Sequence, residues 1–330
     1  MAGFCDVLMV VEQVSGEPRR TSLELATKGR QLAGEAGSRL SAVVVGPGAE
    51  AAAQRLGEFG VERAYVSEDE RFDRFPVLAE AGIVAEAIRR ANPHMVLMAA
   101  SNNGRDLSGR LSARLGVGVI AGATDVRLSE GAPIVVCPIF GGAVQAVKGF
   151  SGELGIALLR PNAVLAERVP APSGVVIEQV EPEFDAGATV EVIETVTEVR
   201  REAPVEEASV IVAGGRGLGG PEGFALLAEL ANALGGSVGA TRAAVDAGWI
   251  GYHTQVGQTG KTVKPTLYVA LGISGAVQHR VGMQTSDVIV AVNKNADASI
   301  FQFADLGVVG DLFEIVPKLT QDIRRRRTRP

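Results

Sequence analysis

The sequence predicts an α/β protein with two domains, each built from parallel strands joined by helices. Three observations support this prediction. The chain has 330 residues, which suits two domains at roughly 100 to 200 residues each. Apolar residues make up 46% and charged residues 21%, the balance of an ordinary globular protein. Short apolar runs alternate with helix-like stretches in both halves, which is typical of a parallel sheet with helical crossovers.

The first half begins with this alternation. Apolar runs at 7–11, 40–45 and 95–100 predict strands, and the stretches 22–36 and 79–90 predict helices between them. From about residue 116 the pattern changes to short β-rich pieces separated by Gly and Pro, which we interpret as strands added to the first domain. These pieces are 133–139, 143–147, 155–159 and 175–180.

An acidic stretch marks the expected domain boundary. Residues 178–207 contain ten acidic side chains and two basic ones. A strand-like run at 189–199 is followed by Pro204. We therefore expect an N-terminal domain over residues 1–204 and a C-terminal domain over 205–330, with the acidic stretch as a solvated face and linker.

The second half repeats the alternation of strands and helices. Its predicted elements are strand 209–213, helix 222–234, strand 237–240, strand 266–271, helix 274–282 and strand 287–292. Pro317 suggests a last strand at 312–315 and then a helix with this proline at its first position, where the missing N–H costs nothing. This order of elements predicts a doubly wound sheet.

Charge and hydropathy exclude several classes of function. With 32 basic and 38 acidic residues the net charge is −6, so no positive field gathers nucleic acid. The longest uncharged runs, such as 131–147, contain Gly and Pro and are shorter than the roughly 20 apolar residues of a membrane span. The N-terminus lacks a basic region before an apolar core, so we expect no secretory signal and a cytoplasmic protein.

Cysteines and histidines are too few and too scattered for a metal or disulfide framework. Cys5 and Cys137 lie far apart in apolar surroundings, which favours buried free thiols. The histidines His94, His253 and His279 are separated widely along the chain, which argues against a metal cluster.

The segment 215–220 matches G-x-G-x-x-G between a predicted strand and a predicted helix, where backbone N–H groups can hold a pyrophosphate. NAD binding also needs an acidic residue about 20 positions on. The second strand instead ends in Thr241 and Arg242, which counts against NAD. The alternative interpretation is that these glycines only allow a tight turn and bind no nucleotide.

Two further loops of the second half contain several polar side chains. The segment 255–262 ends like a phosphate-binding P-loop, but Gln255 replaces its first glycine and no strand precedes it, so an NTPase is disfavoured. The polar side chains of the loop 255–262 suit contacts with a polar heterocycle. The alternative is a polar surface turn without a ligand. Ser274 is the predicted N-cap of the next helix, with Gln278 and His279 in its first turns. A lone helix histidine is more often a solvated surface residue.

These polar residues converge at the carboxyl ends of the strands, where open α/β sheets bind ligands. The last strand of this series places Asn293 and Lys294 at the same edge. The residues expected to meet there are Arg216, Arg242, Gln258, Thr259, Ser274, His279 and Asn293.

With these residues in view, the chain resembles the α-subunits of the electron-transfer flavoprotein family. The strongest similarity covers about residues 205–320, and 104–107 (Gly-Arg-Asp-Leu) adds an N-terminal feature. The motifs are Gly-Gly-Arg-Gly-Leu at 214–218, Arg-Ala-Ala-Val-Asp-Ala-Gly at 242–248, Gln-Val-Gly-Gln-Thr-Gly-Lys at 255–261, Leu-Tyr-Val-Ala-Leu-Gly-Ile-Ser-Gly-Ala-Val-Gln-His at 267–279, Ala-Val-Asn-Lys at 291–294 and Ala-Asp-Leu-Gly-Val-Val-Gly-Asp-Leu-Phe at 304–313.

The resemblance implies a nucleotide-hydrolase-like N-terminal domain that contacts a β-subunit, and a Rossmann-like C-terminal domain that binds one FAD. Arg242 would lie over the isoalloxazine ring with Thr241 beside it. Gln258 and Thr259 would contact the N5 edge, and His279 the N1/O2 side. The rest of the cofactor would be held by Arg216, Gln255, Ser274, Gln278, Asn293 and Asp311.

Arg242 is the expected tuner of the flavin potential, because an arginine keeps its charge. A unit charge about 4 Å away at an effective dielectric near 20 is worth on the order of 4 kcal/mol, or on the order of 100 to 200 mV for one electron. His279, with an ordinary pKa near 6.5, would be charged only in part at neutral pH.

The resulting hypothesis is an electron carrier that links flavoprotein dehydrogenases to a quinone-linked or other acceptor. No general base or nucleophile stands out, which suits a carrier whose cofactor supplies the chemistry. The alternatives are the α-subunit of an electron-bifurcating complex that oxidises NADH through a second FAD, and a stand-alone NAD(P) oxidoreductase. The arginine-rich end 324–329 is interpreted as solvated, with docking to an acidic partner as its alternative.

Overall fold

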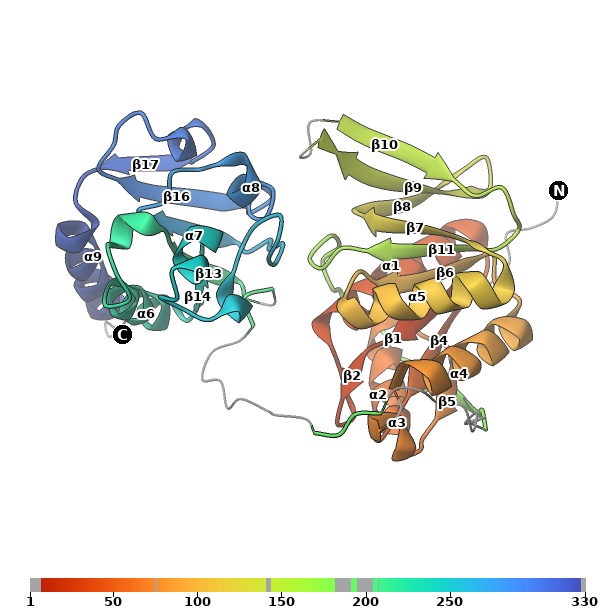
Figure 1. The fold of residues 1–330 in the computed structure, drawn as a ribbon. Helices are drawn as coiled ribbons and strands as arrows, with labels where there is room; N and C mark the ends of the chain where they lie inside the picture. The colour runs from red at the N-terminus through yellow and green to blue at the C-terminus, as the bar shows by residue number, and fades with distance from the viewer. Residues whose placement is uncertain are drawn as a thin grey trace. The chain divides into compact units, whose positions relative to one another are not determined.

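The computed structural model describes residues 7–74, 76–140, 144–181, 191–194, 204–206 and 208–327. The chain divides into two compact units, Met1–Thr197 and Glu198–Pro330, each described by itself (Figure 1). Both are α/β units with parallel sheets, which confirms the predicted fold class. Among the described helices, none is long and apolar enough to cross a membrane.

The first unit is built on a seven-stranded parallel sheet. In spatial order its strands are β12 (Val176–Gln179), β5 (Arg63–Ser67), β4 (Leu40–Val45), β1 (Val7–Val11), β6 (Met95–Ala99), β11 (Gly155–Leu159) and β7 (Gly118–Ala123). Its helices are α1 (Arg20–Ala36), α2 (Ala49–Arg55), α3 (Arg71–Arg74), α4 (Pro76–Ala91) and α5 (Asn102–Leu115). The helical crossovers of this parallel sheet cover both of its faces, with α1 and α2 on one face and α4 and α5 on the other.

Alternate residues of β1 point to opposite faces of this sheet, as the period of a strand requires. Met9 shares a core with Leu25 of α1. Leu8 shares the opposite core with Ile83 of α4 and Leu107 of α5. The continuous apolar run of β1 thus reflects burial on both faces, which is why it was recognisable as a strand.

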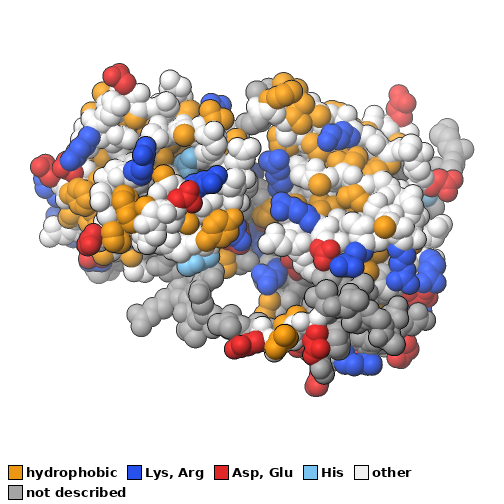
Figure 2. All heavy atoms as spheres, in the orientation of Figure 1, with side chains coloured by type: hydrophobic (Ala, Val, Ile, Leu, Met, Phe, Trp, Pro, Cys, Tyr) orange, Lys and Arg blue, Asp and Glu red, His pale blue; other side chains and the backbone are white. Residues whose placement is uncertain are grey.

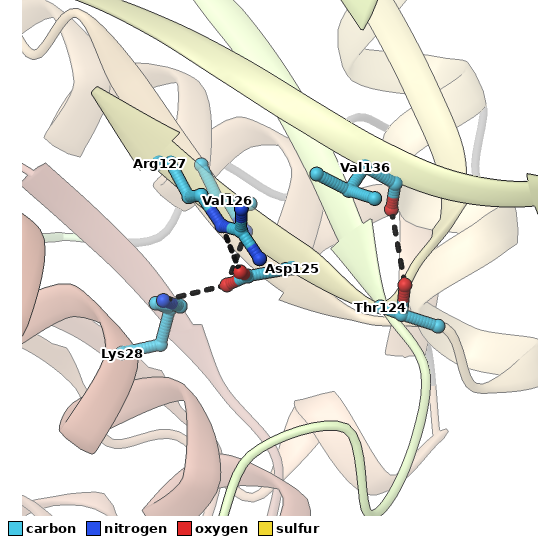
Figure 3. Close-up of polar contacts among 6 residues, drawn as sticks. All are labelled: Lys28, Thr124, Asp125, Val126, Arg127 and Val136. Carbon is cyan, nitrogen blue, oxygen red and sulfur yellow. Dashed lines mark hydrogen bonds and ion pairs between the residues drawn. The ribbon is translucent and has the colours of Figure 1, made fainter. Parts of the chain in front are cut away.

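An antiparallel sheet of three strands is added to the first unit: β8 (Asp125–Ser129), β9 (Ala132–Ile139) and β10 (Val144–Gly149). Lys28 of α1 forms an ion pair with Asp125 at 2.6 Å, and Arg127 donates to the same carboxylate at 2.5 Å (Figure 3). Burial raises the pKa of Asp125, but hydrogen bonds from Lys28 and Arg127 outweigh burial and hold that pKa below its usual value. The carboxylate therefore fixes the start of β8 against α1.

Apolar side chains reach the surface on the β9–β10 hairpin (Figure 2). The most exposed are Phe140, at 83%, and Val147, at 63%. The small sheet of β2 (Gln13–Val14) and β3 (Glu17–Pro18) completes the described strands of this unit. The strand-like run predicted at 189–199 lies largely outside the described residues, and residues 191–194, which are described, form no strand.

The second unit contains a five-stranded parallel sheet. Its spatial order is β14 (Ser237–Ala240), β13 (Val210–Gly214), β15 (Leu267–Leu271), β16 (Val288–Asn293) and β17 (Leu306–Val309). Helices α6 (Gly223–Leu234) and α9 (Leu312–Arg327) pack on one face around Leu227 and Val316. Tyr268 and Val256 belong to the core on the other face.

The expected last strand at 312–315 was wrong, because these residues begin helix α9 and the last strand is β17. Asp311 accepts the N–H of Phe313 at 2.9 Å and so caps the helix. Leu312, Val316 and Thr320 are buried at spacings of four, a helical period. Pro317 therefore lies inside the helix and not at its first position.

The predicted helix at 274–282 is much shorter than expected. Helix α8 spans Val277–Arg280, and its N-cap is Ala276 instead of Ser274. Gly275 has a φ of +86°, and a Cβ there would lie 2.4 Å from the backbone nitrogen of Ile300. The Ser274 carbonyl accepts the N–H of Ile300 at 3.0 Å, so a turn packed against the following loop replaces the first helical turn.

Candidate functional site

A cavity of about 790 Å³ opens at the carboxyl edge of the second unit's sheet. The order of the strands reverses between β13 and β15, which is where open α/β sheets bind their ligands. The volume lies in the range of pockets that hold drug-sized ligands and cofactors. Nine predicted site residues line the cavity: Arg216, Thr241, Arg242, Gln258, Thr259, Ser274, Gln278, His279 and Asn293.

Two glycine turns form the floor between β13 and β15. The N–H of Gly217 donates to the carbonyl of Gly272 at 3.0 Å. A Cβ on Gly217 would lie 2.6 Å from the Cα of Gly272, and Gly272 itself has a φ of +62°. The backbones therefore meet at a distance that only glycine allows, and the G-x-G pattern serves this close approach.

The loop 255–261 is fastened on several sides. The N–H of Val256 donates to Ala240 of β14 at 2.9 Å, and the N–H of Gln258 donates to the carbonyl of Gln278 at 2.7 Å. Lys261 forms an ion pair with Glu206 at 2.6 Å. The exposed side chains of Gln258 and Thr259 are thus held at the cavity by a fixed backbone.

Gln255 is predicted as a site residue, but it does not line the cavity. Its side chain is 2% exposed, and its Nε2 donates to the hydroxyl of Thr259 at 3.1 Å. The hydroxyl of Tyr252 also donates, at 2.7 Å, to the carbonyl of Thr259. Gln255 and Tyr252 therefore orient Thr259, whose hydroxyl keeps its own proton for another acceptor.

Thr241 and Arg242 stand at the carboxyl end of β14, where helix α7 (Arg242–Asp246) begins. The hydroxyl of Thr241 is buried and has no hydrogen-bond partner in the described structure. Arg242 lies 3.1 Å from the carboxylate of Asp246, and its side chain is 65% exposed. The cavity wall thus contains the buried hydroxyl of Thr241, which has no hydrogen-bond partner among the described residues, and the exposed positive charge of Arg242.

His279 is buried, so the alternative of a solvated surface histidine was wrong. Its Nδ1 lies 3.0 Å from the carbonyl of Val256, and its Nε2 lies 3.0 Å from the hydroxyl of Tyr268. Burial lowers the pKa of His279 to about 4, against the opposite effect of the hydrogen bond to Val256. The expected partial charge at neutral pH is therefore replaced by a neutral imidazole.

At the other side of the cavity Asn293 bridges two loops. Its Nδ2 donates to the carbonyl of Ile273 at 2.8 Å, and its Oδ1 accepts the N–H of Asn295 at 2.9 Å. Asp311 does not line the cavity. Lys294 forms an ion pair with it at 2.9 Å, and this contact, with the N–H of Phe313, holds the pKa of Asp311 below its usual value.

Sequence reasoning missed several polar residues of the cavity wall. Asn295, Asp297 and Ser299 follow β16 and line it. The rule that selected Asn293, a polar residue after the carboxyl end of a strand, applies to these residues as well. Asp246 also lines the cavity, one helical turn after Arg242.

The cysteine and the arginine-rich end singled out in the sequence do not line this cavity. Cys137 is a buried free thiol, as expected, and Cys5 is outside the described residues. No group of three metal-ligating side chains occurs among the described residues. Arg324, Arg325 and Arg326 belong to the last turns of α9 and are largely exposed, with Arg325 and Arg326 both paired with Asp322.

Comparison with known proteins gives two family matches. Residues 7–194 match the electron transfer flavoprotein domain, and residues 204–284 match the electron transfer flavoprotein FAD-binding domain. The second match contains the glycine turn after β13 and the loop 255–261, both of which line the cavity.

Relatives named electron transfer flavoprotein subunit alpha match over nearly the full length. The protein of Mycobacterium tuberculosis (strain ATCC 25618 / H37Rv) is 43% identical, over 98% of this chain and 100% of its own. That of Thermoanaerobacterium thermosaccharolyticum is 38% identical, over 98% and 99%. That of Bacillus subtilis is 37% identical, over 97% of both chains. An X-ray structure assigned as a thiamin diphosphate-dependent enzyme from Mycobacterium smegmatis covers 96% of this chain and 59% of its own, at 10% identity and a TM-score of 0.25, too low for any argument.

Proposed function

Because this chain belongs to the electron transfer flavoprotein family, as an α-subunit with its FAD-binding domain, we propose that it binds FAD in the cavity of the second unit and works as one subunit of an electron carrier. The single observation that supports the location is the coincidence of the FAD-binding match with a large cavity at the switch point of the sheet.

The residues present fit FAD. The hydroxyl of Thr241 is buried without a partner, which is costly unless a ligand supplies one. Gly215 and Gly217 line the cavity without side chains, so the turn after β13 presents its backbone to a ligand there. Polar groups with fixed orientation line the rest of the wall, including Thr259 and Asn293.

When bound, FAD supplies the redox chemistry, and the chain supplies binding, orientation and electrostatics. Gln255 directs the Thr259 hydroxyl by donating to its oxygen. Arg242 provides positive charge, which Asp246 at 3.1 Å partly offsets. We therefore place the contribution of Arg242 to the flavin potential at the lower end of the sequence-based estimate, at most about 100 mV.

The direct cofactor contacts proposed from the sequence divide into two groups. The nine residues that line the cavity are proposed to contact FAD or to lie directly beside it. For Gln255 and Asp311 we propose indirect roles, because Gln255 supports Thr259 and Asp311 caps α9 beside Lys294.

We further propose a heterodimer with a β-subunit, which the name of the relatives, subunit alpha, supports. The electron donors would be flavoprotein dehydrogenases and the acceptor a quinone-linked or other oxidoreductase. The histidine of the cavity supports a carrier over a proton-transfer enzyme, because hydrogen bonds occupy both of its ring nitrogens and leave it no role as a general base.

The test is to co-express the chain with its β-subunit, purify the complex, quantify FAD per heterodimer, and titrate it with dithionite and then NADH. One FAD and no reaction with NADH is the expected result. Two FADs with reduction by NADH would support the bifurcating complex instead, and a complex without flavin would overturn both.

A pair of threonine variants tests the location of FAD. Thr241→Val removes the unpartnered hydroxyl and should weaken FAD binding severalfold, the cost of one lost hydrogen bond. Thr254→Val is the control, because the Thr254 hydroxyl donates to Gly251 at 2.8 Å and does not line the cavity. Equal FAD affinity in the two variants would contradict the proposed location.

A further inference from the structure

Two side chains of one short turn hold the same residue of the cavity wall. The 3₁₀ helix η4 (Tyr252–Thr254) has Gln255 as its C-cap. Residues three positions apart lie on the same side of a 3₁₀ helix, which brings Tyr252 and Gln255 together. The hydroxyl of Tyr252 donates to the carbonyl of Thr259 at 2.7 Å, and Nε2 of Gln255 donates to the Thr259 hydroxyl at 3.1 Å.

The turn that carries these two residues is itself fixed by hydrogen bonds. The carbonyl of Gly251 accepts both the N–H of Thr254, at 3.1 Å, and the Thr254 hydroxyl, at 2.8 Å. The N–H of Gln255 donates to the carbonyl of Tyr252 at 3.0 Å. Thr254 and Gln255 are buried, whereas Tyr252 is 62% exposed. Tyr252 therefore reaches Thr259 from a fixed backbone at the surface of the second unit.

These contacts leave Thr259 with two unused donors. Its two accepting groups, the carbonyl and the hydroxyl oxygen, already receive a proton from Tyr252 and Gln255. Among the described residues, no acceptor is bonded to its backbone N–H or to the proton of its hydroxyl. Because Thr259 lines the cavity, both donors are available to a ligand there.

The Tyr252 hydroxyl is the one partner of the Thr259 main chain in the described structure. The N–H of the next residue, Gly260, donates to the carbonyl of Gly257 at 3.0 Å and so closes the turn around Thr259. Without the Tyr252 hydroxyl, Thr259 itself would be held only through its side chain, by Gln255. The direction of its backbone N–H therefore depends on Tyr252.

We propose that Tyr252 is a positioning residue of the flavin site, whose hydroxyl fixes the backbone of Thr259 so that both donors of Thr259 are directed at an acceptor atom of the cofactor. The inference rests on the proposed function for the identity of the cofactor, but the hydrogen bonds belong to the chain alone. Tyr252 lies between the family motifs 242–248 and 255–261, which is why it is not among the site residues expected from the resemblance.

The consequence concerns both the affinity and the redox potential of the cofactor. Donors directed at an acceptor atom favour the form of a ligand that carries more negative charge at that atom. By holding Thr259, Tyr252 should therefore strengthen the binding of FAD and raise its midpoint potential.

The first experiment uses Tyr252→Phe in complex with the β-subunit. The variant removes the hydroxyl and keeps the ring, which is largely exposed, so the fold is not at risk. FAD affinity should fall about twofold to tenfold, the range for one lost hydrogen bond. The midpoint potential should fall by about 30 mV, which is a threefold change in relative affinity for the two redox states at about 59 mV per tenfold.

His253→Gln is the matched control for this variant. His253 is an exposed neighbour on the same turn and does not line the cavity, so FAD affinity and potential should equal the native values. Native values of both quantities in Tyr252→Phe would overturn the proposal.

A double-mutant cycle tests whether Tyr252 acts through Thr259. Thr259→Val removes the hydroxyl and keeps the backbone N–H. The change in potential caused by Tyr252→Phe should be smaller in the Thr259→Val background than in the native one, because one of the two positioned donors is already lost. Additive effects of the two substitutions would contradict the route through Thr259.

Hydrogen exchange provides a measurement that needs no cofactor. The backbone amides of residues 255–261 should exchange about twofold to tenfold faster in Tyr252→Phe than in the native chain or in His253→Gln, whether or not FAD is bound. Equal exchange in the three proteins would show that Tyr252 does not hold the loop.

The two proposals fail in different ways. A complex that contains no FAD contradicts the proposed function, and faster exchange of the loop in Tyr252→Phe would still support the hold of Tyr252 on Thr259. A complex that contains FAD, with the same affinity and potential in Tyr252→Phe as in the native protein, contradicts the positioning role alone.

Discussion

The two units differ at the place in each sheet where the order of the strands reverses. In each unit the strand order reverses beside the first strand, between β1 and β6 in the first unit and between β13 and β15 in the second. In open α/β sheets a ligand binds in the crevice at this point. The second unit has glycine turns and a cavity there.

In the first unit the same point is filled by the chain's own carboxylates. Glu12 follows β1, and its side chain accepts from the hydroxyl of Ser101, which follows β6 and caps α5 by accepting from Gly104. Glu80 of α4 is buried there and accepts from Asn103 at 3.3 Å. A phosphate placed at this edge would lie beside two carboxyl groups, those of Glu12 and Glu80.

The same sheet topology therefore occurs in both units, but the side chains and glycines at the edge determine whether a ligand can bind there. In the second unit glycine turns and a cavity lie at this edge, and in the first unit a serine cap and two glutamates lie there. This contrast between the two sheet edges makes four substitutions informative, and Gly272→Ala is expected to have the strongest effect.

Gly272→Ala should reduce FAD binding in the cavity of the second unit more than the other substitutions do. The φ of +62° costs about 1 to 2 kcal/mol for alanine, and the added Cβ lies 2.8 Å from the Cα of Gly217, an overlap that costs about 1 to 3 kcal/mol more. FAD content, measured after purification of the complex, should fall to a small fraction of the native value.

Gly37→Ala is the control for this variant. Gly37, at the end of α1, has a φ of +63° but nothing within 4 Å of a Cβ, so it has the conformational cost without the overlap. Its FAD content should equal that of the native complex. Similar losses of FAD in the two variants would show that the glycine floor is not specific to the cavity.

Glu80→Gln should stabilise the closed crevice above neutral pH. Burial raises the pKa of Glu80 to about 7, with a further increase from the charge of Glu12 and a decrease from Asn103. The native state keeps the proton up to about pH 7, whereas the unfolded chain loses it near 4.5. The carboxyl therefore costs stability that grows from about pH 4.5 to 7, up to about 3 kcal/mol.

The measurement is chemical unfolding of the complex at pH 5 and pH 8. Glu80→Gln should gain little at pH 5 and most at pH 8. Glu35→Gln, an identical change at an exposed position of α1, is the control and should change stability at neither pH. An equal gain at both pH values would contradict the raised pKa of Glu80.

Arg242→Gln should lower the midpoint potential of bound FAD by at most about 100 mV, since a permanent positive charge is lost and Asp246 loses its partner. Arg242→Lys keeps the charge and should retain most of the potential. Arg280→Gln changes a charge outside the cavity lining and should have little effect. Potentials measured by dye-linked titration that are equal in native protein and Arg242→Gln would exclude Arg242 as the tuner.

The smallest effect is expected from Lys261→Met. The ion pair with Glu206 fastens the loop 255–261, but both side chains are partly exposed, so it contributes about 0.2 to 1 kcal/mol. FAD affinity should fall no more than about fivefold. A double-mutant cycle with Glu206→Gln isolates the pair, and additive effects of the two substitutions would show that the pair does not hold the loop.

Much of both sheets could be predicted from the sequence, because strands buried on both faces are continuous apolar runs. The runs 7–11 and 40–45 coincide with β1 and β4. Strand β7 was missed because its exposed and half-buried residues include two glycines and form no such run. The helix expected from Pro317 onward was predicted, but the start of α9 at Leu312 was missed because Pro317 outweighed the helical spacing of Leu312 and Val316.

The candidate site was predicted as a set of loop residues, and its internal hydrogen bonds were not. Position after a strand selects Thr259 and Asn293, but it does not show that Gln255 points at Thr259 and away from the cavity. The buried His279 is hydrogen-bonded to Tyr268, a residue of another element 11 positions away. Such pairings arise from tertiary packing, which spacing along one chain does not report.

The bridge between Val256 and Ala240 has a consequence for solubility. Strand β14 is an outer strand of its sheet, with β13 as its partner in the ladder, and unpaired outer strands invite pairing with other chains. The N–H of Val256 covers the end of this strand, from the same loop that presents Gln258 and Thr259 to the cavity. Substitutions that loosen this loop would uncover the end of the strand, so we expect such variants to aggregate more readily than the native protein.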